Sequence, residues 1–284
     1  MDAFKLHRQV VENYRDYLKS FIKIKDDKIR SYVEEKFESQ GFIPDPIIQF
    51  NPSYKRSETL KDLHDVGKIH QELINIFGAF RLYKHQIEGI KKGIAGEGFV
   101  VTSGTGSGKS LIFLATIFNH ILNLKPKTKG VKAILVYPMN ALINSQLEEI
   151  QKYELNYLMQ FVNQNDRHHF DPRSEENTQL TLADLLLKIR NHTGRACPFT
   201  YERYTGQEGT EERERISAAQ PDIILTNYMM LELVMTRANE SWLRDSIRKN
   251  LTYLVFDELH TYRGRQGADV SLLIRRIKQL AENR

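Results

Sequence analysis

A glycine-rich octapeptide at residues 103–110, Ser-Gly-Thr-Gly-Ser-Gly-Lys-Ser, has the residue types and spacing of a phosphate-binding loop. Glycine lets the backbone approach phosphate oxygens closely, and N–H groups at the start of a helix favour a bound anion. Lys109 can place its ammonium against the β- and γ-phosphates of ATP, and the Ser110 hydroxyl can ligate Mg²⁺. The residues predicted to bind the nucleotide here are Ser103, Gly104, Thr105, Gly106, Ser107, Gly108, Lys109 and Ser110.

A second cluster of reactive side chains, Asp257-Glu-Leu-His260, follows an apolar run at 251–256. Asp257 is predicted to hold Mg²⁺ through water, and Glu258 to polarise the attacking water as a general base. Acidic pairs are common at strand ends, so the assignment depends on the phosphate loop upstream. His260 has two open interpretations: it couples the nucleotide to bound nucleic acid, or it forms a hydrogen bond across the domain.

Gln86 precedes the phosphate loop in Leu-Tyr-Lys-His-Gln-Ile. A glutamine amide carries both a donor and an acceptor, and it can read the edge of adenine. The alternative is an ordinary exposed glutamine on a helix. Beside a phosphate loop we favour adenine recognition.

Short apolar runs that alternate with helical sequence must position these groups. Each run is followed by a stretch with the 3.6-residue apolar period of a helix. This alternation predicts an α/β fold with a mostly parallel sheet covered by helices on both faces. The expected strands are 98–102, 131–137, 222–226 and 251–256.

The N-terminal part has a different character. Helical periodicity covers residues 1–40, Pro44, Pro46 and Pro52 predict an extended stretch, and helical sequence returns at 57–80. We expect residues 1–78 to form a helical accessory segment and residues 79–284 to form the nucleotide-binding domain.

Within the nucleotide-binding domain, a polar stretch at 156–196 is expected to be an insertion with a short helix at 181–190. Its adjacent histidines, His168 and His169, are interpreted as solvated rather than metal-binding.

The composition of the chain limits the classes of protein to which it can belong. Lys plus Arg outnumber Asp plus Glu, 41 against 36, which gives a formal charge of +5 and is compatible with a nucleic-acid partner. The single cysteine, Cys197, excludes an internal disulfide or a cysteine-based zinc cluster. The sequence shows neither an apolar run long enough to span a membrane nor a secretory leader. A cytoplasmic location is therefore expected.

Together these motifs resemble the first RecA-like motor domain of superfamily 2 helicases. Gln86 matches the Q motif, residues 103–110 motif I, and residues 257–260 motif II in its DExH form. Ser103 stands where the general phosphate-loop pattern has glycine, a variant typical of helicases. Residues 137–146 resemble motif Ia.

The resemblance implies ATP and Mg²⁺ as cofactors, and it implies a nucleic-acid strand held by its phosphates, without sequence readout. Lys109, Asp257, Glu258 and His260 are the catalytic positions that it implies. The positions implied for nucleic-acid contact are Pro138, Asn140, Thr205, Gly206, Thr226 and Asn227.

A narrower resemblance joins the sequence to large bacterial DEAD/DEAH-box helicases related to mitomycin repair and to DISARM and Druantia phage defence. It is carried by Tyr-Pro-Met-Asn-Ala-Leu, Arg-Tyr-Thr-Gly-Gln and Asp-Glu-Leu-His-Thr-Tyr-Arg-Gly. It implies 3′→5′ movement on single-stranded DNA, in bacterial repair or defence. DNA against RNA and unwinding against translocation stay open.

We find no second RecA-like domain with its arginine fingers in these 284 residues. Because such an arginine stabilises the transition state of hydrolysis, the chain is expected to bind ATP·Mg²⁺ weakly and to hydrolyse it poorly without a second domain or subunit. The alternatives are a nucleotide-dependent module that binds DNA or protein without moving, and an RNA helicase fragment. A small-molecule kinase is the remotest, because no acceptor pocket is recognisable.

Overall fold

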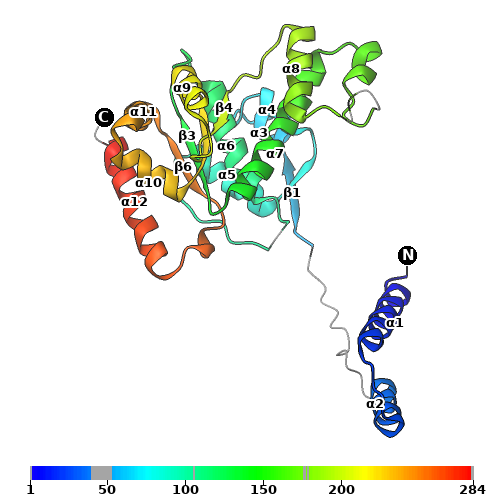
Figure 1. Ribbon diagram of the computed structural model, residues 1–284. Coiled ribbons are helices and arrows are strands. Elements are labelled where there is room, and N and C mark those ends of the chain that lie inside the picture. Colours follow the sequence, from blue (N-terminus) through cyan, green and yellow to red (C-terminus); the bar gives the residue numbers. More distant parts are fainter. Residues whose placement is uncertain (1, 40–52, 105, 175–176, 178, 283–284) are drawn as a thin grey trace. The chain divides into compact units, whose positions relative to one another are not determined.

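The computed structural model describes residues 2–39, 53–104, 106–174, 177 and 179–282, and the chain divides into two compact units, Met1–Ser53 and Tyr54–Arg284 (Figure 1). The first unit contains α1 (Ala3–Phe21) and α2 (Asp27–Ser39). These helices agree with the helical periodicity of residues 1–40. The extended stretch predicted around Pro44, Pro46 and Pro52 lies outside the described residues.

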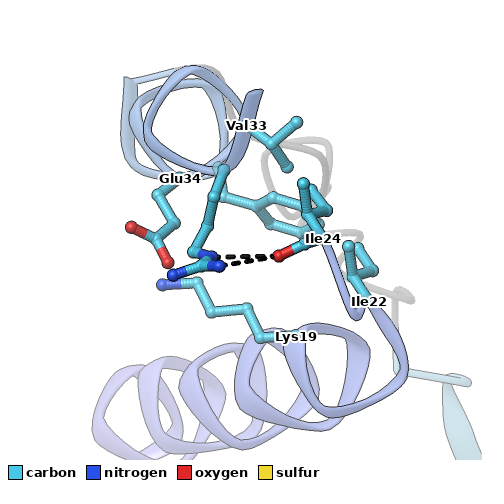
Figure 2. Close-up of a pocket in the computed structure, with 7 residues that line it drawn as sticks. Lys19, Ile22, Ile24, Val33 and Glu34 are labelled. Atoms are coloured by element: carbon cyan, nitrogen blue, oxygen red, sulfur yellow. Dashed lines mark hydrogen bonds between the residues drawn. The ribbon is translucent and has the colours of Figure 1, made fainter. Parts of the chain in front are cut away.

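A polar contact fixes the turn between α1 and α2. The Arg30 guanidinium donates hydrogen bonds of 3.1 and 2.9 Å to the Ile24 carbonyl (Figure 2). A pocket beside this contact is lined by Lys19, Val33 and Glu34, among others. Its lining holds no phosphate-binding motif or acidic pair, so it is not the candidate nucleotide site.

The second unit is built on a parallel sheet with the strand order β4-β5-β3-β6. Its strands are β3 (Ala133–Tyr137), β4 (Tyr201–Arg203), β5 (Ile223–Asn227) and β6 (Tyr253–Phe256). In register, Ala133 of β3 lies opposite Ile223 of β5 and Tyr253 of β6. The strands predicted at 131–137, 222–226 and 251–256 are therefore present, and they are parallel as expected.

Helices cover both faces of this sheet, each over its own hydrophobic cluster (Figure 1). Leu135 and Leu225 face one cluster and Ile134 and Ile224 face the other, as the two-residue period of a strand requires. The first cluster includes residues of α5 (Lys84–Ile94), α6 (Lys109–Asn123) and α7 (Asn140–Leu158). The second includes residues of α10 (Tyr228–Thr236), α11 (Ser241–Asn250) and α12 (Gly264–Glu282). The predicted α/β class is confirmed.

The strand predicted at 98–102 is wrong. Residues 97–104 form no strand, and Phe99 and Val100 are 38% and 76% exposed. The run is apolar, but an apolar run is buried only where a neighbouring strand and a helix cover it. No strand of the described chain pairs with the outer edge of β6 or with this segment.

Residues 54–83 pack with the nucleotide-binding unit. They contain β1 (Arg56–Thr59), α3 (Leu60–Asp65), α4 (Glu72–Phe77) and β2 (Arg81–Tyr83). β1 pairs antiparallel with β2, and Leu60 and Leu73 are fully buried in the same cluster as α6. The compact unit consequently begins at Tyr54, earlier than the boundary expected at residue 78, and the division into domains stays a prediction.

The polar insertion folds around a small core of its own. It contains η1 (Met159–Phe161), η2 (Gln164–Phe170) and α8 (Leu182–Thr193), which is the helix expected at 181–190. A fully buried carboxylate, Glu154 of α7, ties it to the sheet by accepting from Arg190 Nε at 2.8 Å and from the Tyr201 hydroxyl at 2.7 Å. The residues of this core are Leu158, Val162, Phe170, Leu185, Leu186 and Ile189.

No described helix combines the length and apolar character that a membrane span needs. No group of three or more His, Cys, Asp or Glu side chains in the described residues is arranged to hold a metal ion.

Candidate nucleotide site and nucleic-acid interface

The phosphate loop closes on its own lysine. The Lys109 ammonium donates to the carbonyls of Ser103 and Gly104, at 3.0 and 3.2 Å. The hydroxyl oxygens of Ser103 and Ser107 lie 2.6 Å apart, and this contact joins the two ends of the loop. Gly108 directly precedes α6 and has a left-handed φ of 70°, which an L side chain adopts only with strain. The loop therefore surrounds a cation at the start of a helix, as anion binding requires.

The structure leaves the predicted roles of two loop residues, Thr105 and Ser110, as predictions. Thr105 lies outside the described residues. Ser110 is the second residue of α6 and is half-buried. Its place beside Lys109 is compatible with the predicted Mg²⁺ ligand, which stays a prediction.

Gln86 is not an exposed helix residue but is buried against the phosphate loop, 4% exposed. Its amide oxygen accepts from the Tyr83 N–H at 2.9 Å, and its Nε2 donates to the Gly108 carbonyl at 3.0 Å. A Cβ atom on Gly108 would lie 2.4 Å from that Nε2. Gln86 thus connects the start of α5 to the start of α6 through the two ends of its amide, and its closeness to residue 108 explains why that position must be glycine.

A cluster of aromatic side chains beside the loop went unnoticed in the sequence. The rings of Tyr54 and Tyr83 have centroids 5.3 Å apart, and His85 lies 5.0 Å from Tyr54. His85 Nε2 is 3.1 Å from the Ser107 carbonyl, so the cluster contacts the loop directly. Tyr83 and His85 flank Gln86 in sequence and could have been found there, whereas Tyr54 lies in a segment read as accessory.

Asp257 extends the sheet at the end of β6. Its N–H donates to the Val136 carbonyl of β3 at 2.9 Å, and its carboxylate accepts from the Glu258 N–H at 2.9 Å. Burial raises the pKa of Asp257, the Glu258 carboxylate raises it further, and the Lys109 ammonium opposes the rise. The fold thus brings the phosphate loop and the acidic cluster within electrostatic reach, although they are far apart in the sequence.

The backbone turns sharply at Glu258, which has a left-handed conformation with φ 48°. Such a conformation is strained for a residue other than glycine, and the strain is often found at functional sites. His260 Nδ1 lies 3.2 Å from Glu258 Oε2, and both side chains are open to solvent. His260 is therefore placed to orient the Glu258 carboxylate, a contact that neither of the two interpretations of the sequence included, and its role stays a prediction.

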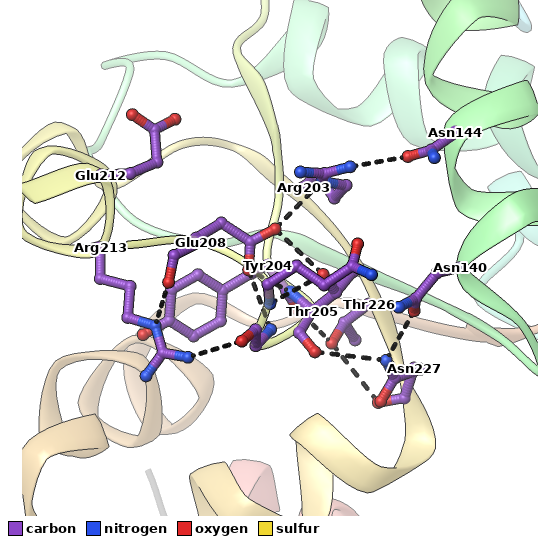
Figure 3. A network of polar contacts seen from close by, with 12 residues as sticks. Asn140, Asn144, Arg203, Tyr204, Thr205, Glu208, Glu212, Arg213, Thr226 and Asn227 are labelled. Carbon is purple, nitrogen blue, oxygen red and sulfur yellow. Dashed lines mark hydrogen bonds and ion pairs between the residues drawn. The ribbon is translucent and has the colours of Figure 1, made fainter. Parts of the chain in front are cut away.

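Polar side chains link the three segments predicted to contact nucleic acid (Figure 3). Asn227 caps α10 by accepting from the Met230 N–H at 2.8 Å, and it donates to Asn140 Oδ1 at 2.9 Å. It also donates to the Thr205 carbonyl at 3.4 Å. Asn140, Thr205 and Asn227 are thus brought together by the fold.

The turn at Thr205 and Gly206 carries its own anion. The Glu208 carboxylate, 3% exposed, accepts from the N–H groups of Thr205 and Gly206 at 2.8 and 2.9 Å, and from Arg203 Nε at 3.0 Å (Figure 3). Burial opposes ionisation of Glu208, but these hydrogen bonds hold its pKa below the usual value. A phosphate that used these two amides would have to displace Glu208. The chain continues from Glu208 into α9 (Thr210–Ala219).

Thr226 is placed differently from the prediction. It lies inside β5, is 2% exposed, and its hydroxyl donates to the Tyr204 carbonyl at 2.6 Å. Its hydroxyl is used to hold β4 against β5, so it has no free group for a phosphate. Pro138 directly follows β3 and is half-buried. The roles of both residues in nucleic-acid contact stay predictions.

Comparisons with known proteins agree with these motifs. The DEAD/DEAH box helicase family matches residues 83–191 and 181–284. An uncharacterized ATP-dependent helicase of Methanocaldococcus jannaschii is 33% identical over 211 residues, which are 74% of this chain and 25% of the relative. Druantia protein DruE of Escherichia coli is 25% identical over 95% of this chain and 19% of its own length. The chain thus spans a quarter or less of these relatives.

Solved structures give the same fold. A DUF1998 helicase, MrfA, bound to DNA superposes with a TM-score of 0.56 at 21% identity, over 82% of this chain and 26% of MrfA. The helicase Lhr of Mycobacterium smegmatis, bound to single-stranded DNA and AMP-PNP, superposes with a TM-score of 0.53 at 19% identity, over 76% of this chain and 23% of Lhr. At these identities the likeness establishes the RecA-like fold and no more.

Proposed function

Because the chain belongs to the DEAD/DEAH box helicase family, we propose that it is the ATP-binding motor domain of a DNA helicase or translocase. One observation carries the proposal. The Lys109 ammonium at the start of α6 is close enough to the Asp257 carboxylate at the end of β6 to oppose the rise in its pKa, so the phosphate loop and the acidic cluster lie near each other.

Each part of the site has a role in this proposal. The backbone N–H groups of the phosphate loop and Lys109 bind the phosphates, and Ser110 and Asp257 hold Mg²⁺, the latter through water. Bound Mg²⁺ would neutralise charge on the phosphate oxygens. Glu258, oriented by His260, accepts a proton from the attacking water.

The base of the nucleotide is proposed to lie against the aromatic cluster of Tyr54, Tyr83 and His85. Aromatic side chains stack on the flat face of a purine, and this contact does not distinguish one purine from another. Gln86, beside the cluster, then reads the adenine edge only if it exchanges one of its hydrogen bonds to the loop. We propose ATP and Mg²⁺ as the cofactors on this basis.

Single-stranded DNA is proposed to cross the polar edge formed by Asn140, Thr205 and Asn227, beside Pro138. The relatives and the similar structures include a Druantia protein and helicases bound to DNA, which supports a role in bacterial repair or phage defence. Contacts to phosphates position a strand without reading its sequence. Movement in the 3′→5′ direction belongs to the same proposal.

We further propose that a second RecA-like domain or subunit completes the motor. Hydrolysis by such motors needs an arginine that faces the phosphates from the partner domain, worth about 10³–10⁵ in rate. Arg263 and Arg265 follow Glu258 too closely in sequence to face it from another domain. The chain by itself is accordingly expected to bind ATP and to hydrolyse it slowly.

Binding measurements test this function. Fluorescence anisotropy of labelled single-stranded DNA and RNA of equal length is measured with and without ATP·Mg²⁺, at rising salt. We expect tighter binding to DNA, weakening with salt and a change in affinity on addition of nucleotide. Preference for RNA would favour the RNA helicase alternative, and binding insensitive to nucleotide would favour a binding module.

A further inference from the structure

Among the buried side-chain nitrogen and oxygen atoms of the described residues, two tyrosine hydroxyls lack a hydrogen-bond partner. The hydroxyl oxygens of Tyr137 and Tyr262 are buried, and neither has a hydrogen-bond partner. Tyr137 is 1% exposed. A buried donor without a partner costs free energy, and phenylalanine would fill the same space without that cost. The hydroxyl of Tyr137 therefore needs an explanation.

Tyr137 lies next to the acidic cluster. It is the last residue of β3, and the parallel register that joins Val136 to Phe256 continues to place Tyr137 opposite Asp257. Opposed residues on parallel strands direct their side chains to the same face of the sheet. Tyr137 packs in the cluster that contains Leu111 and Leu114 of α6, so both side chains share the face covered by the helix of the phosphate loop.

The electrostatic environment agrees with this placement. Burial raises the pKa of Tyr137, and the carboxylates of Asp257 and Glu149 raise it further. Glu149 already accepts a hydrogen bond of 2.9 Å from the Tyr153 hydroxyl. Asp257 accepts from the Glu258 N–H, and a carboxylate has room for about three further hydrogen bonds. Both carboxylates can accept further hydrogen bonds, and Asp257 is the one that lies opposite Tyr137 in the register of β3 and β6.

We propose that Tyr137 is a positioning residue whose hydroxyl donates a hydrogen bond to the Asp257 carboxylate when the site holds Mg²⁺ and nucleotide. The inference rests on the proposed binding of ATP·Mg²⁺. A second donor beside the carboxylate fixes its orientation, as hydrogen bonds to metal ligands commonly do.

Tyr262 is the weaker candidate for the same role. Its ring packs against Tyr228 and Phe256, whose side chains belong to the cluster on the opposite face of the sheet. The helix of the phosphate loop covers the other face. Tyr137 is therefore the donor on the side where the nucleotide binds.

The experiment removes one oxygen atom. Affinity of a fluorescent ATP analogue is measured for the whole chain and for Tyr137→Phe, in EDTA and along a Mg²⁺ titration. We expect an unchanged affinity in EDTA and a Mg²⁺ midpoint raised about threefold to tenfold, since a hydrogen bond to a charged group is lost. Tyr153→Phe, which loses a hydroxyl bonded to Glu149 in the same cluster, is the matched control and should leave the midpoint unchanged.

Three outcomes separate the possibilities. An unchanged Mg²⁺ midpoint in Tyr137→Phe overturns the inference and leaves the proposed function intact. Equal losses of affinity in EDTA and in Mg²⁺ also overturn it, because they indicate altered packing. If the unaltered chain shows no nucleotide binding that depends on Mg²⁺, the proposed function fails and the inference fails with it. In an Asp257→Asn background the effect of Tyr137→Phe should vanish.

Discussion

Two glycine-containing turns in this chain look equally suited to bind phosphate, and they differ in the charge that fills them. In the loop at 103–110 the Lys109 ammonium bonds to backbone carbonyls. In the turn at Thr205 and Gly206 the Glu208 carboxylate bonds to backbone N–H groups. The first turn presents a cation to an incoming phosphate, whereas the second already holds an anion.

The difference shows that glycine alone does not make an anion site. Glycine gives the backbone freedom to expose its N–H groups, but a neighbouring side chain decides whether those groups are available. Lys109 leaves the loop positive at the start of α6. Glu208 is held by two amides and by Arg203, and it occupies the N–H groups of its turn. A phosphate can bind these N–H groups only after Glu208 is displaced.

The largest expected effect comes from removing the cation. Lys109→Ala should weaken ATP·Mg²⁺ binding about 100-fold, because a charge-assisted contact to the phosphates is lost. Isothermal titration calorimetry measures the affinity. Lys92→Ala, which removes an exposed lysine paired with Glu97, is the control and should bind as the unaltered chain does. Equal binding by the two variants would refute the role of Lys109.

The second prediction concerns the backbone of the loop. Gly108→Ala should lower nucleotide affinity about tenfold, since a Cβ atom there meets Gln86 Nε2 at 2.4 Å and the left-handed φ adds about 1–2 kcal/mol of strain. Gly96→Ala is the matched control, with a φ of +76° and open space around its Cβ. If both variants lose affinity equally, the contact with Gln86 is unimportant.

The third prediction tests the filled turn. Glu208→Gln should raise the affinity for single-stranded DNA about threefold, because a negative charge leaves the two amides. Fluorescence anisotropy measures the change, with Glu212→Gln of α9 as a control for loss of a carboxylate that is paired with Arg215. A larger gain from Glu212→Gln would show that Glu208 does not keep phosphate away from the turn.

The same turn predicts a dependence on pH. Because the pKa of Glu208 is lowered in the folded chain, its contribution to stability is present above the pKa of the unfolded chain and is lost as the pH falls through the folded value. The unaltered chain should therefore lose more stability than Glu208→Gln as the pH falls below the pKa of the unfolded chain, and the stabilities of the two chains should converge at low pH. Circular dichroism along a pH titration gives the comparison.

The smallest expected effect is on stability at the acidic cluster. The pKa of Asp257 is raised by burial, so its ionisation in the folded chain costs stability above that pKa. Asp257→Asn should raise the melting temperature at pH 7 by a few degrees and should remove the Mg²⁺ dependence of nucleotide binding. Asp245→Asn, on the exposed side of α11, should do neither.

The sequence predicted strands β3, β5 and β6 of the sheet correctly. The runs that became β3, β5 and β6 are continuous and apolar, and each precedes a helix that covers them. It failed at 98–102, where the run is equally apolar but no described strand lies beside it. The apolar pattern of a segment indicates that the segment can form a buried strand. Whether it does so depends on a neighbouring strand and a covering helix from other parts of the chain.

The residues of the candidate site that lie in sequence motifs could be predicted, and the others could not. Lys109, Gln86 and Asp257 lie in motifs whose spacing reports their chemistry. Glu208 could not be found that way, because its role comes from two amides held in place by β4 and the turn that follows. The pairing of β1 with β2 was also missed, since both strands are short and largely polar.

The outer edge of β6 has a consequence for handling the protein. Unpaired N–H and C=O groups along an edge strand are a template for pairing with another chain. The apolar segment at 98–102, which forms no strand itself and has Val100 76% exposed, is long enough for such pairing. Concentrated solutions of this chain are therefore expected to form reversible oligomers through backbone contacts, a property that sedimentation velocity would detect as a concentration-dependent shift.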